Sequence, residues 1–240
     1  MSDDVTRDLA AAAAQPRDDA SAPAAADDLP VAATVVVLRD APGGAEALLI
    51  HRPDRGSFAG AWVFPGGKLE PSDEGDDEEA AARAAAIRET WEETGLRLAP
   101  DALHAFARWE PPPGIALRIR TWFFLARDTG TELALADAEA VGAMWARPAD
   151  VLARHSRGEL TLYPPTWVTL HELSGGGVDA LLARADREAL RTYETAQHHG
   201  GHGTLLLWRE DAEYDAAAAG GSARHRLDVS ALPWVYTRAD

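Results

Sequence analysis

Apolar and polar positions divide the chain into two parts. Residues 1–30 are dominated by Ala, Asp and Pro, contain no aromatic residue and show no continuous apolar face. Such a segment cannot bury enough apolar surface to offset the entropy cost of ordering, so we predict a disordered acidic tail. From residue 31 onward, apolar runs alternate with short segments rich in Gly and Pro, and this pattern indicates a folded region.

Several of the apolar runs predict β-strands. Residues 31–39 form a β-branched run suited to a buried strand, and residues 47–52 form a second one after a Pro-Gly-Gly turn at 42–44. Together they predict an early hairpin. Further strands are predicted at 62–64, 118–126, 143–145, 205–208 and 226–229.

Other segments carry helix signals. An Ala-rich stretch at 78–94 ends before Gly95, which is well placed as a C-cap. Pro148 opens another helix, and two more are predicted at 165–173 and 178–193. Because strands and helices do not alternate strictly, we predict a mixed-sheet α/β or α+β fold.

Composition limits the possible partners and metal ligands of the protein. The chain has 240 residues, a net charge of -16 and no cysteine. The acidic balance argues against a nucleic-acid partner. The lack of thiols leaves carboxylates, carbonyls and imidazoles as metal ligands. No apolar run approaches the roughly 18 residues of a membrane span, and no signal peptide is evident, so we expect a soluble, unexported, cytoplasmic protein without a membrane partner.

Three glutamates share one face of the predicted helix at 78–94. At about 100° per residue, Glu89, Glu92 and Glu93 fall within one arc of about 100°. Nearly opposite lies a stripe that we expect to pack on the core, formed by Ala80, Ala84, Ile87 and Trp91.

The position of these glutamates is locally unfavourable. They occupy the last turn, where the helix dipole disfavours anions by roughly 0.3 to 1 kcal/mol each. Glu89 and Glu93 also form a repulsive i,i+4 pair. A bound cation would compensate both effects, whereas a solvated acidic face in an acidic protein is the alternative. The helix alone leaves the two interpretations open.

A glycine turn precedes this helix. The sequence Phe64-Pro65-Gly66-Gly67 delivers a short strand into a backbone turn that exposes carbonyls and amides. A carbonyl oxygen with two or three carboxylates is a suitable partial shell for Mg²⁺, which takes its remaining ligands from water and substrate phosphates.

The stretch Gly66–Glu70 (GGKLE) followed after a spacer by 88–96 (RETWEETGL) resembles the signature of the Nudix hydrolase family. The resemblance covers residues 31–155 and leaves 156–240 as a C-terminal, partly helical extension packed on the core. It implies an α/β/α sandwich with a mixed sheet, and attack of water on a nucleoside diphosphate linked to another group.

The resemblance also implies roles for individual residues. It makes Glu92 and Glu93 ligands of Mg²⁺ (or Mn²⁺), Glu89 a ligand or general base, and the Gly67 carbonyl a further ligand. Arg88 becomes an orienting partner of the catalytic group.

Two positions depart from the family pattern. The stretch from Gly67 to Arg88 is seven residues longer than usual, so the usual acidic partner of Arg88 is not assignable, and Glu78 or Glu79 is the candidate. Thr90 stands where the family has an aliphatic residue. Glu139 lies where some members place another carboxylate, although we interpret it as a surface-loop residue.

The substrate is less defined. Residues 48–67 and 160–173 resemble the extended-spacer group of coenzyme A and acyl-CoA diphosphatases. ADP-ribose, nucleotide sugars, dinucleoside polyphosphates and oxidised nucleoside triphosphates remain alternatives. The candidate phosphate contacts are Arg52, Lys68, Arg118 and Arg120. Arg118 and Arg120 share a strand face with Trp122, where they could bind phosphate, or they are charges that protect an edge strand.

Other features receive structural interpretations. His198, His199 and His202 lie among glycines, and we predict a flexible loop in place of a metal site. We expect core packing first for the tryptophans at 62, 91, 145, 167 and 234.

Other functional classes remain open. A catalytically silent module that senses a nucleotide would conflict with the intact glutamate set. An interaction protein whose acidic helix binds a basic partner would show no metal dependence. The sequence leaves a homodimer open.

Overall fold

The computed structural model describes residues 29–56, 58–115, 118–136, 139–200, 203–215 and 221–239. The predicted tail therefore lies outside the described residues except for Leu29 and Pro30. Within the described part, no helix has the length and apolar character needed to cross a bilayer.

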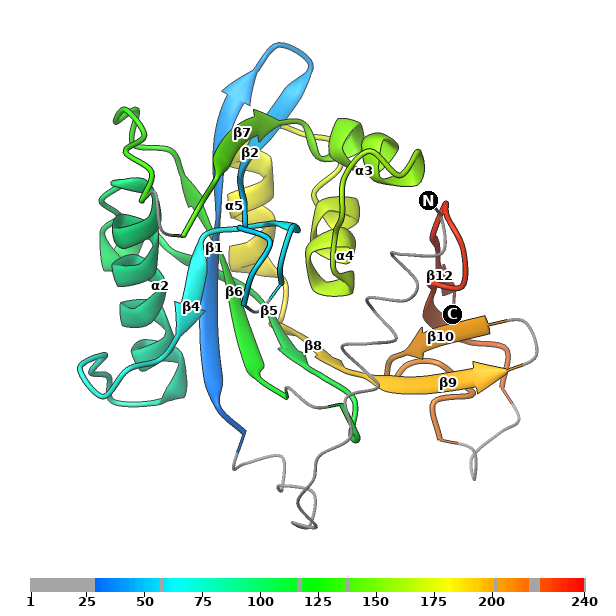
Figure 1. Cartoon of the computed structure of the whole chain (residues 1–240). Coiled ribbons are helices and arrows are strands. Elements are labelled where there is room, and N and C mark those ends of the chain that lie inside the picture. Colours follow the sequence, from blue (N-terminus) through cyan, green and yellow to red (C-terminus); the bar gives the residue numbers. More distant parts are fainter. Residues whose placement is uncertain are drawn as a thin grey trace.

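A mixed sheet forms the centre of the fold (Figure 1). Strand β1 (Val31–Ala41) pairs antiparallel with β2 (Gly44–His51) and parallel with β6 (Arg120–Arg127). The predicted hairpin and the predicted mixed sheet are therefore confirmed. The other strands are β3 (Trp62–Val63), β4 (Gly66–Lys68), β5 (His104–Glu110), β7 (Gly142–Ala146) and β8 (Arg191–Glu194). Their order is β3-β2-β1-β6-β5-β8, with β4 also on β1 and β7 also on β2.

Helices cover both faces of this sheet (Figure 1). Helix α2 (Glu78–Thr94) packs on the face that carries Val35 and Val37, and α5 (Val178–Arg187) lies on the other face. Helices α3 (Pro148–Ser156) and α4 (Pro164–Glu172) lie on the same face of the sheet as α5. The short 3₁₀ turn η2 (Pro100–Ala102) lies on the α2 face. The predicted α/β/α sandwich is confirmed.

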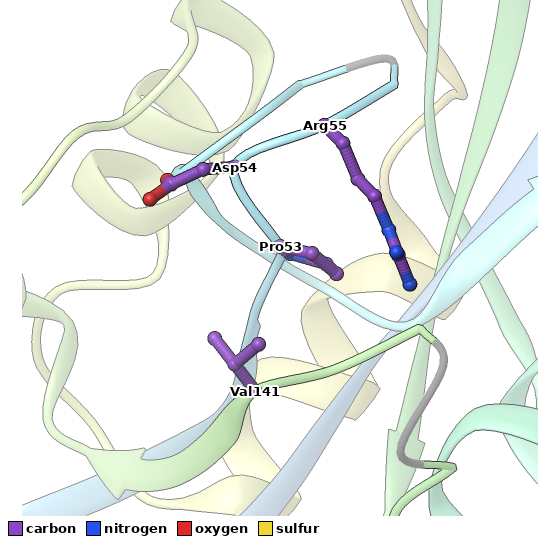
Figure 2. A pocket seen from close by; sticks show the side chains of 4 residues that line it. All are labelled: Pro53, Asp54, Arg55 and Val141. Atoms are coloured by element: carbon purple, nitrogen blue, oxygen red, sulfur yellow. The ribbon is translucent and has the colours of Figure 1, made fainter.

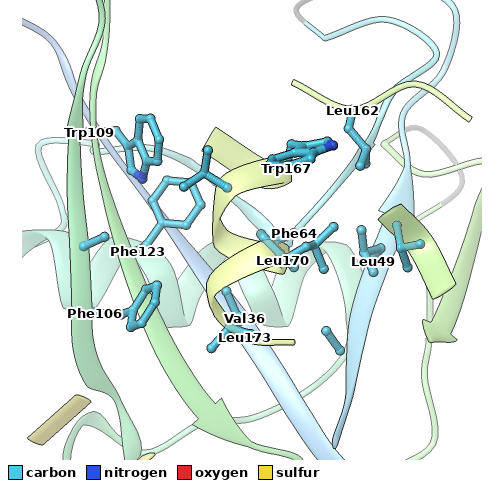
Figure 3. Close-up of a cluster of buried hydrophobic side chains, with 14 of the residues drawn as sticks. Val36, Leu49, Phe64, Phe106, Trp109, Phe123, Leu162, Trp167, Leu170 and Leu173 are labelled. Atoms are coloured by element: carbon cyan, nitrogen blue, oxygen red, sulfur yellow. The ribbon is translucent and has the colours of Figure 1, made fainter. Parts of the chain in front are cut away.

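The larger core lies on the α4 and α5 side of the sheet. Figure 3 shows Val36 and Leu49 from the sheet packed toward Trp167, Leu170 and Leu173 of the helical layer. Alternate residues of β1 therefore serve the two cores, as the two-residue period of a strand requires.

Helix α2 has the predicted ends. Asp77 caps its start by accepting a hydrogen bond from the Ala80 N–H (2.8 Å), and Gly95 ends it in the left-handed region (φ 74°). The predicted core stripe is correct only in part, because Ile87 packs against the core whereas Trp91 does not. Ala82, Ala85 and Ala86 are buried against the sheet, whereas Trp91 is 45% exposed.

The small side chains explain this orientation. Alanine lets the helix axis approach the sheet closely, and the two Ala triplets at 80–82 and 84–86 give only a weak amphipathic signal for the buried face. The expectation of core packing for Trp91 is wrong for the same reason. Its ring instead stacks under the Arg97 guanidinium at 5.0 Å.

The chain after α5 also corrects the sequence prediction. The helix predicted for 178–193 ends at Arg187, and Arg191–Glu194 form β8, which pairs parallel with β5. Tyr193 stacks on Trp109 with ring centroids 4.0 Å apart, so tertiary packing outweighs local helix propensity here.

A second, four-stranded antiparallel sheet follows. It has the order β12 (Val235–Ala239), β11 (Arg224–Asp228), β10 (Gly203–Leu207) and β9 (Ala196–Gly200). The flexible loop predicted for the histidines is wrong for His198 and His199, which lie in β9 and pair with Leu205 and Thr204. His202 lies outside the described residues.

His155 makes stability depend on pH. It is buried in α3 against Trp234, and both ring nitrogens lack a hydrogen-bond partner in the described part of the chain. Burial lowers its pKa from 6.5 to about 4. The unfolded chain therefore takes up this proton first as the pH falls. Its neutral form supports folding fully above about pH 6.5, and this support is lost on acidification toward pH 4.

We expect His155→Leu to remove this dependence. Between pH 7.5 and pH 5, the wild type should lose about 2 kcal/mol of unfolding free energy relative to the variant. Urea unfolding of both proteins at the two pH values measures the difference. Parallel losses in the two proteins would contradict the assignment.

Candidate metal centre and active site

Strand β4 brings a diglycine against β1. Gly66 has φ +155°, and a Cβ built on it would lie 2.3 Å from the Ala33 carbonyl oxygen, so only glycine fits here. The Gly66 N–H donates to Oε2 of Glu93 (2.8 Å). The strand thus fixes one oxygen of a helix α2 carboxylate.

Gly67 provides room for a second carboxylate. A Cβ at this position would lie 2.3 Å from the Cδ atom of Glu89. The missing side chain therefore allows the Glu89 carboxylate to rest on the backbone of β4. A metal-binding role for the Gly67 carbonyl stays a prediction.

Three carboxylates converge at this point. Glu89, Glu93 and Glu139 each offer an oxygen, and these atoms lie within 4.8 Å of one another. Glu93 is only 1% exposed, and burial raises its pKa to about 8. Burial also raises the pKa of Glu89. Carboxylates so placed are ionised at low cost only when a cation compensates them.

Glu139 corrects the sequence interpretation. We expected a surface-loop residue, but its carboxylate joins the two helix glutamates. The segment before β7 carries it, and the Val141 N–H just beyond it donates to the carbonyl of His51 (2.9 Å) at the end of β2. The sheet therefore holds this segment beside the helix.

Glu92 lies apart from the cluster. Its side chain is 43% exposed and accepts a hydrogen bond from Arg88 Nη1 (3.1 Å). The structure brings Glu89 and Glu93 together but not Glu92. The metal-ligand role of Glu92 stays a prediction.

Arg88 has a different acidic partner from the two we named. Its Nε and Nη2 atoms donate to the two carboxylate oxygens of Asp73 at 3.0 and 2.9 Å, and this pairing lowers the pKa of Asp73. Glu78 instead binds Arg120, and Glu79 binds Arg83. In the family pattern the acidic partner stands six residues after the glycine, and Asp73 occupies that position after Gly67, so the extra residues lie between Asp73 and Arg88.

The predicted phosphate contacts are distributed unevenly. Arg52 reaches the cluster and donates from Nη1 to Oε1 of Glu93 (2.8 Å). The exposed side chain of Lys68 follows Gly67 directly, and the Lys68 carbonyl accepts from Arg88 Nη2 (3.0 Å).

The two arginines near β6 are engaged elsewhere. Arg120 is 7% exposed and pairs with Glu78 at 2.5 Å, while Trp122 Nε1 donates to the other Glu78 oxygen. Arg118 Nε donates to the Pro111 carbonyl. The contacts of Arg120 lock the first turn of α2 to the sheet, so they account for this residue without a ligand.

Figure 2 shows an open hollow on the surface. It has a volume of about 360 Å³ and is lined by Pro53, Asp54, Arg55 and Val141. Pro53 directly follows Arg52, and Val141 lies two residues after Glu139. Sequence reasoning passed over this hollow because its lining comes from two loops that are distant along the chain.

The α/β/α sandwich and the carboxylates of α2 that face the diglycine of β4 agree with what the Nudix resemblance implies, a hydrolase of pyrophosphate bonds. The model of the NUDIX domain matches residues 28–165. The chain therefore belongs to the Nudix family.

The chain is also similar to solved structures. A NUDIX hydrolase from Alicyclobacillus acidocaldarius is 28% identical, with 68% of this chain and 97% of that chain covered and a TM-score of 0.57. A MutT NUDIX hydrolase from Burkholderia pseudomallei is 20% identical, with coverages of 61% and 99% and a TM-score of 0.49. The NUDIX domain of Shewanella oneidensis NrtR, complexed with ADP ribose, is 17% identical, with coverages of 68% and 94% and a TM-score of 0.47. None of the curated proteins matches the chain.

Proposed function

We propose that the protein is a divalent-metal-dependent diphosphatase that acts on a nucleoside diphosphate linked to a second group. The observation that carries the proposal is the convergence of Glu89, Glu93 and Glu139 against the diglycine strand. A solvated acidic face would not bury Glu93 or press Glu89 onto a glycine.

The donor set fits a hard cation. Three carboxylates offer only oxygen ligands, the type that Mg²⁺ and Mn²⁺ take, and the chain has no thiol to favour softer ions. Glu89, Glu93 and Glu139 would hold the ion, with Glu92 as a further candidate. When bound, such an ion neutralises charge on the diphosphate and lowers the pKa of a bound water.

The surrounding side chains orient the carboxylates. Arg88 is fixed by Asp73 and donates to Oε1 of Glu89 (2.9 Å), so it sets the direction of that carboxylate. Arg52 and the Gly66 amide do the same for Glu93. Glu89 rests on the open backbone of Gly67, and it is the group that we assign to take a proton from the attacking water.

Coenzyme A and acyl-CoA are the first substrates to test. The two segments that resemble the CoA diphosphatase group, 48–67 and 160–173, lie side by side. Ala61 bridges to Thr161, the Trp62 N–H donates to the Thr161 carbonyl (3.0 Å), and Phe58 packs edge-on against Tyr163. This adjacency supports a common role for them beside the glutamates. ADP-ribose, nucleotide sugars and dinucleoside polyphosphates are the alternatives.

A substrate panel tests the proposal. Product release from CoA, acetyl-CoA, ADP-ribose, NADH, diadenosine polyphosphates and nucleoside triphosphates is measured with Mg²⁺, with Mn²⁺ and with EDTA. We expect EDTA-sensitive splitting of CoA into 4′-phosphopantetheine and adenosine 3′,5′-bisphosphate. Hydrolysis of another substrate but not of CoA would support the proposed reaction and contradict CoA as the substrate.

The same panel separates the competing functions. A folded protein that binds a nucleotide but turns over nothing would be a nucleotide-sensing module. A protein indifferent to metal that binds basic partners would support the interaction hypothesis. The homodimer and the cytoplasmic location remain predictions.

A further inference from the structure

Arg55 is the cation that enters the hollow beside the glutamate cluster. Figure 2 shows its side chain extending from the loop into the space, while the Asp54 carboxylate points away from it. Oδ1 of Asp54 lies 2.7 Å from the position that a Cβ of Gly60 would take, so this acid is turned toward its own loop. The positive charge of Arg55 therefore dominates the hollow.

The floor of the hollow is apolar. Val141 is 60% exposed and presents its apolar side chain to the hollow. Beside it lies Pro53, which follows the arginine that contacts Glu93. The hollow thus combines one cation with an apolar surface, and this combination suits a nucleoside that carries an anionic substituent.

The hollow and the cluster share no lining residue but are connected through the chain, because Pro53 follows Arg52, which contacts Glu93, and Val141 follows Glu139 by two residues. The glutamates lie on α2 and at position 139, whereas the hollow is formed by 53–55 and Val141. A substrate with its diphosphate at the cluster would place one linked group over Val141. Arg55 would then meet a charge on that group and not the diphosphate itself.

We infer that Arg55 selects substrates whose nucleoside bears a phosphate in addition to the diphosphate. This inference rests on the proposed function and names its substrate class: a phosphorylated nucleoside diphosphate. A guanidinium offers paired N–H donors that match phosphate oxygens. The protein carries a net charge of -16, so an additional phosphate would be repelled without a local cation.

Matched substrates test this selection. CoA and dephospho-CoA differ by one 3′-phosphate, and NADPH and NADH differ by one 2′-phosphate. For Arg55→Gln we expect kcat/KM for the more phosphorylated member to fall roughly tenfold, with the other member changed less than about twofold. Arg55→Lys should retain part of the preference. Arg157→Gln, which removes the same charge from the end of α3, is the control and should change neither value.

Binding gives a readout that does not depend on turnover. Calorimetry with Mg²⁺ compares adenosine 3′,5′-bisphosphate with AMP for the wild type and Arg55→Gln. We expect tighter binding of the bisphosphate by the wild type and loss of that preference in the variant.

The outcomes separate the two proposals. If no substrate is hydrolysed but the binding preference disappears in Arg55→Gln, the proposed function fails and the role of Arg55 stands. Equal losses on both members of each pair would assign Arg55 to the diphosphate and overturn the inference. An unchanged preference would overturn it as well.

Discussion

Glu93→Gln should lower kcat by at least about 10²-fold while leaving the folded protein as stable as the wild type, or slightly more stable. The variant removes a charged ligand from the centre of the cluster. Burial raises the pKa of Glu93 to about 8, so the metal-free folded state disfavours the charged carboxylate at pH 7, and a neutral amide avoids this unfavourable burial of charge. EDTA-sensitive product release and thermal unfolding measure the two effects.

Glu79→Gln is the matched control for this variant. It makes the same change in the first turn of α2, where Glu79 forms a partly exposed pair with Arg83. We expect a change in unfolding free energy of at most about 0.5 kcal/mol and normal turnover. A folded Glu93→Gln protein with near wild-type turnover would contradict the assignment of Glu93 to a metal centre.

The two glycines of β4 should respond differently to alanine. Gly67→Ala places a methyl group 2.3 Å from the end of the Glu89 side chain, which moves aside at little cost to folding. Because that carboxylate then leaves the cluster, we expect kcat to fall about 10²-fold or more. The unfolding free energy should change by less than about 1 kcal/mol.

Gly66→Ala should instead damage the fold. Its methyl group would meet the backbone of Ala33 and Thr34, which cannot rotate away, and φ +155° strains any residue with a side chain. We expect a loss of about 3 kcal/mol or more in unfolding free energy. Urea unfolding and kcat for both variants measure the contrast. Equal stability losses at 66 and 67 would contradict this division of roles.

Local chemistry explains which elements the sequence predicts well. The ends of α2 depend on Asp77 and Gly95, whose effects operate within one helical turn. The face that α2 buries depends on how closely it approaches β1, and the alanines at 80–82 and 84–86 give little indication of that face. The incorrect part of the predicted stripe and the exposed Trp91 have this one cause.

Non-local pairing explains the elements that were missed. Strand β5 contains a bulge between Ala105 and Ala107, which interrupts the alternation of its side chains, and we predicted no strand there. Strand β8 exists because β5 offers it a parallel partner and Tyr193 meets Trp109. Neither the parallel pairing with β5 nor the contact with Trp109 can be predicted from the local sequence around 191–194.

The site was predictable where it is continuous in sequence. Glu89 and Glu93 share a helix, so their periodicity brings them together. Glu139 joins them only through the packing of the segment before β7, and Asp73 was hidden because the extra residues obscured its distance from Arg88. Such partners become visible only when the chain is folded.

The pairing of β8 with β5 has a consequence for where the domain ends. The family model stops at residue 165, yet β5 finds its outer neighbour at Arg191–Glu194. A fragment cut at 165 would leave the backbone donors and acceptors of β5 open to water and strip Tyr193 from the face of Trp109. Such an open edge recruits strands from other molecules. We therefore expect the C-terminal extension to protect this edge from self-association, and a stable fragment of the protein to extend at least through β8.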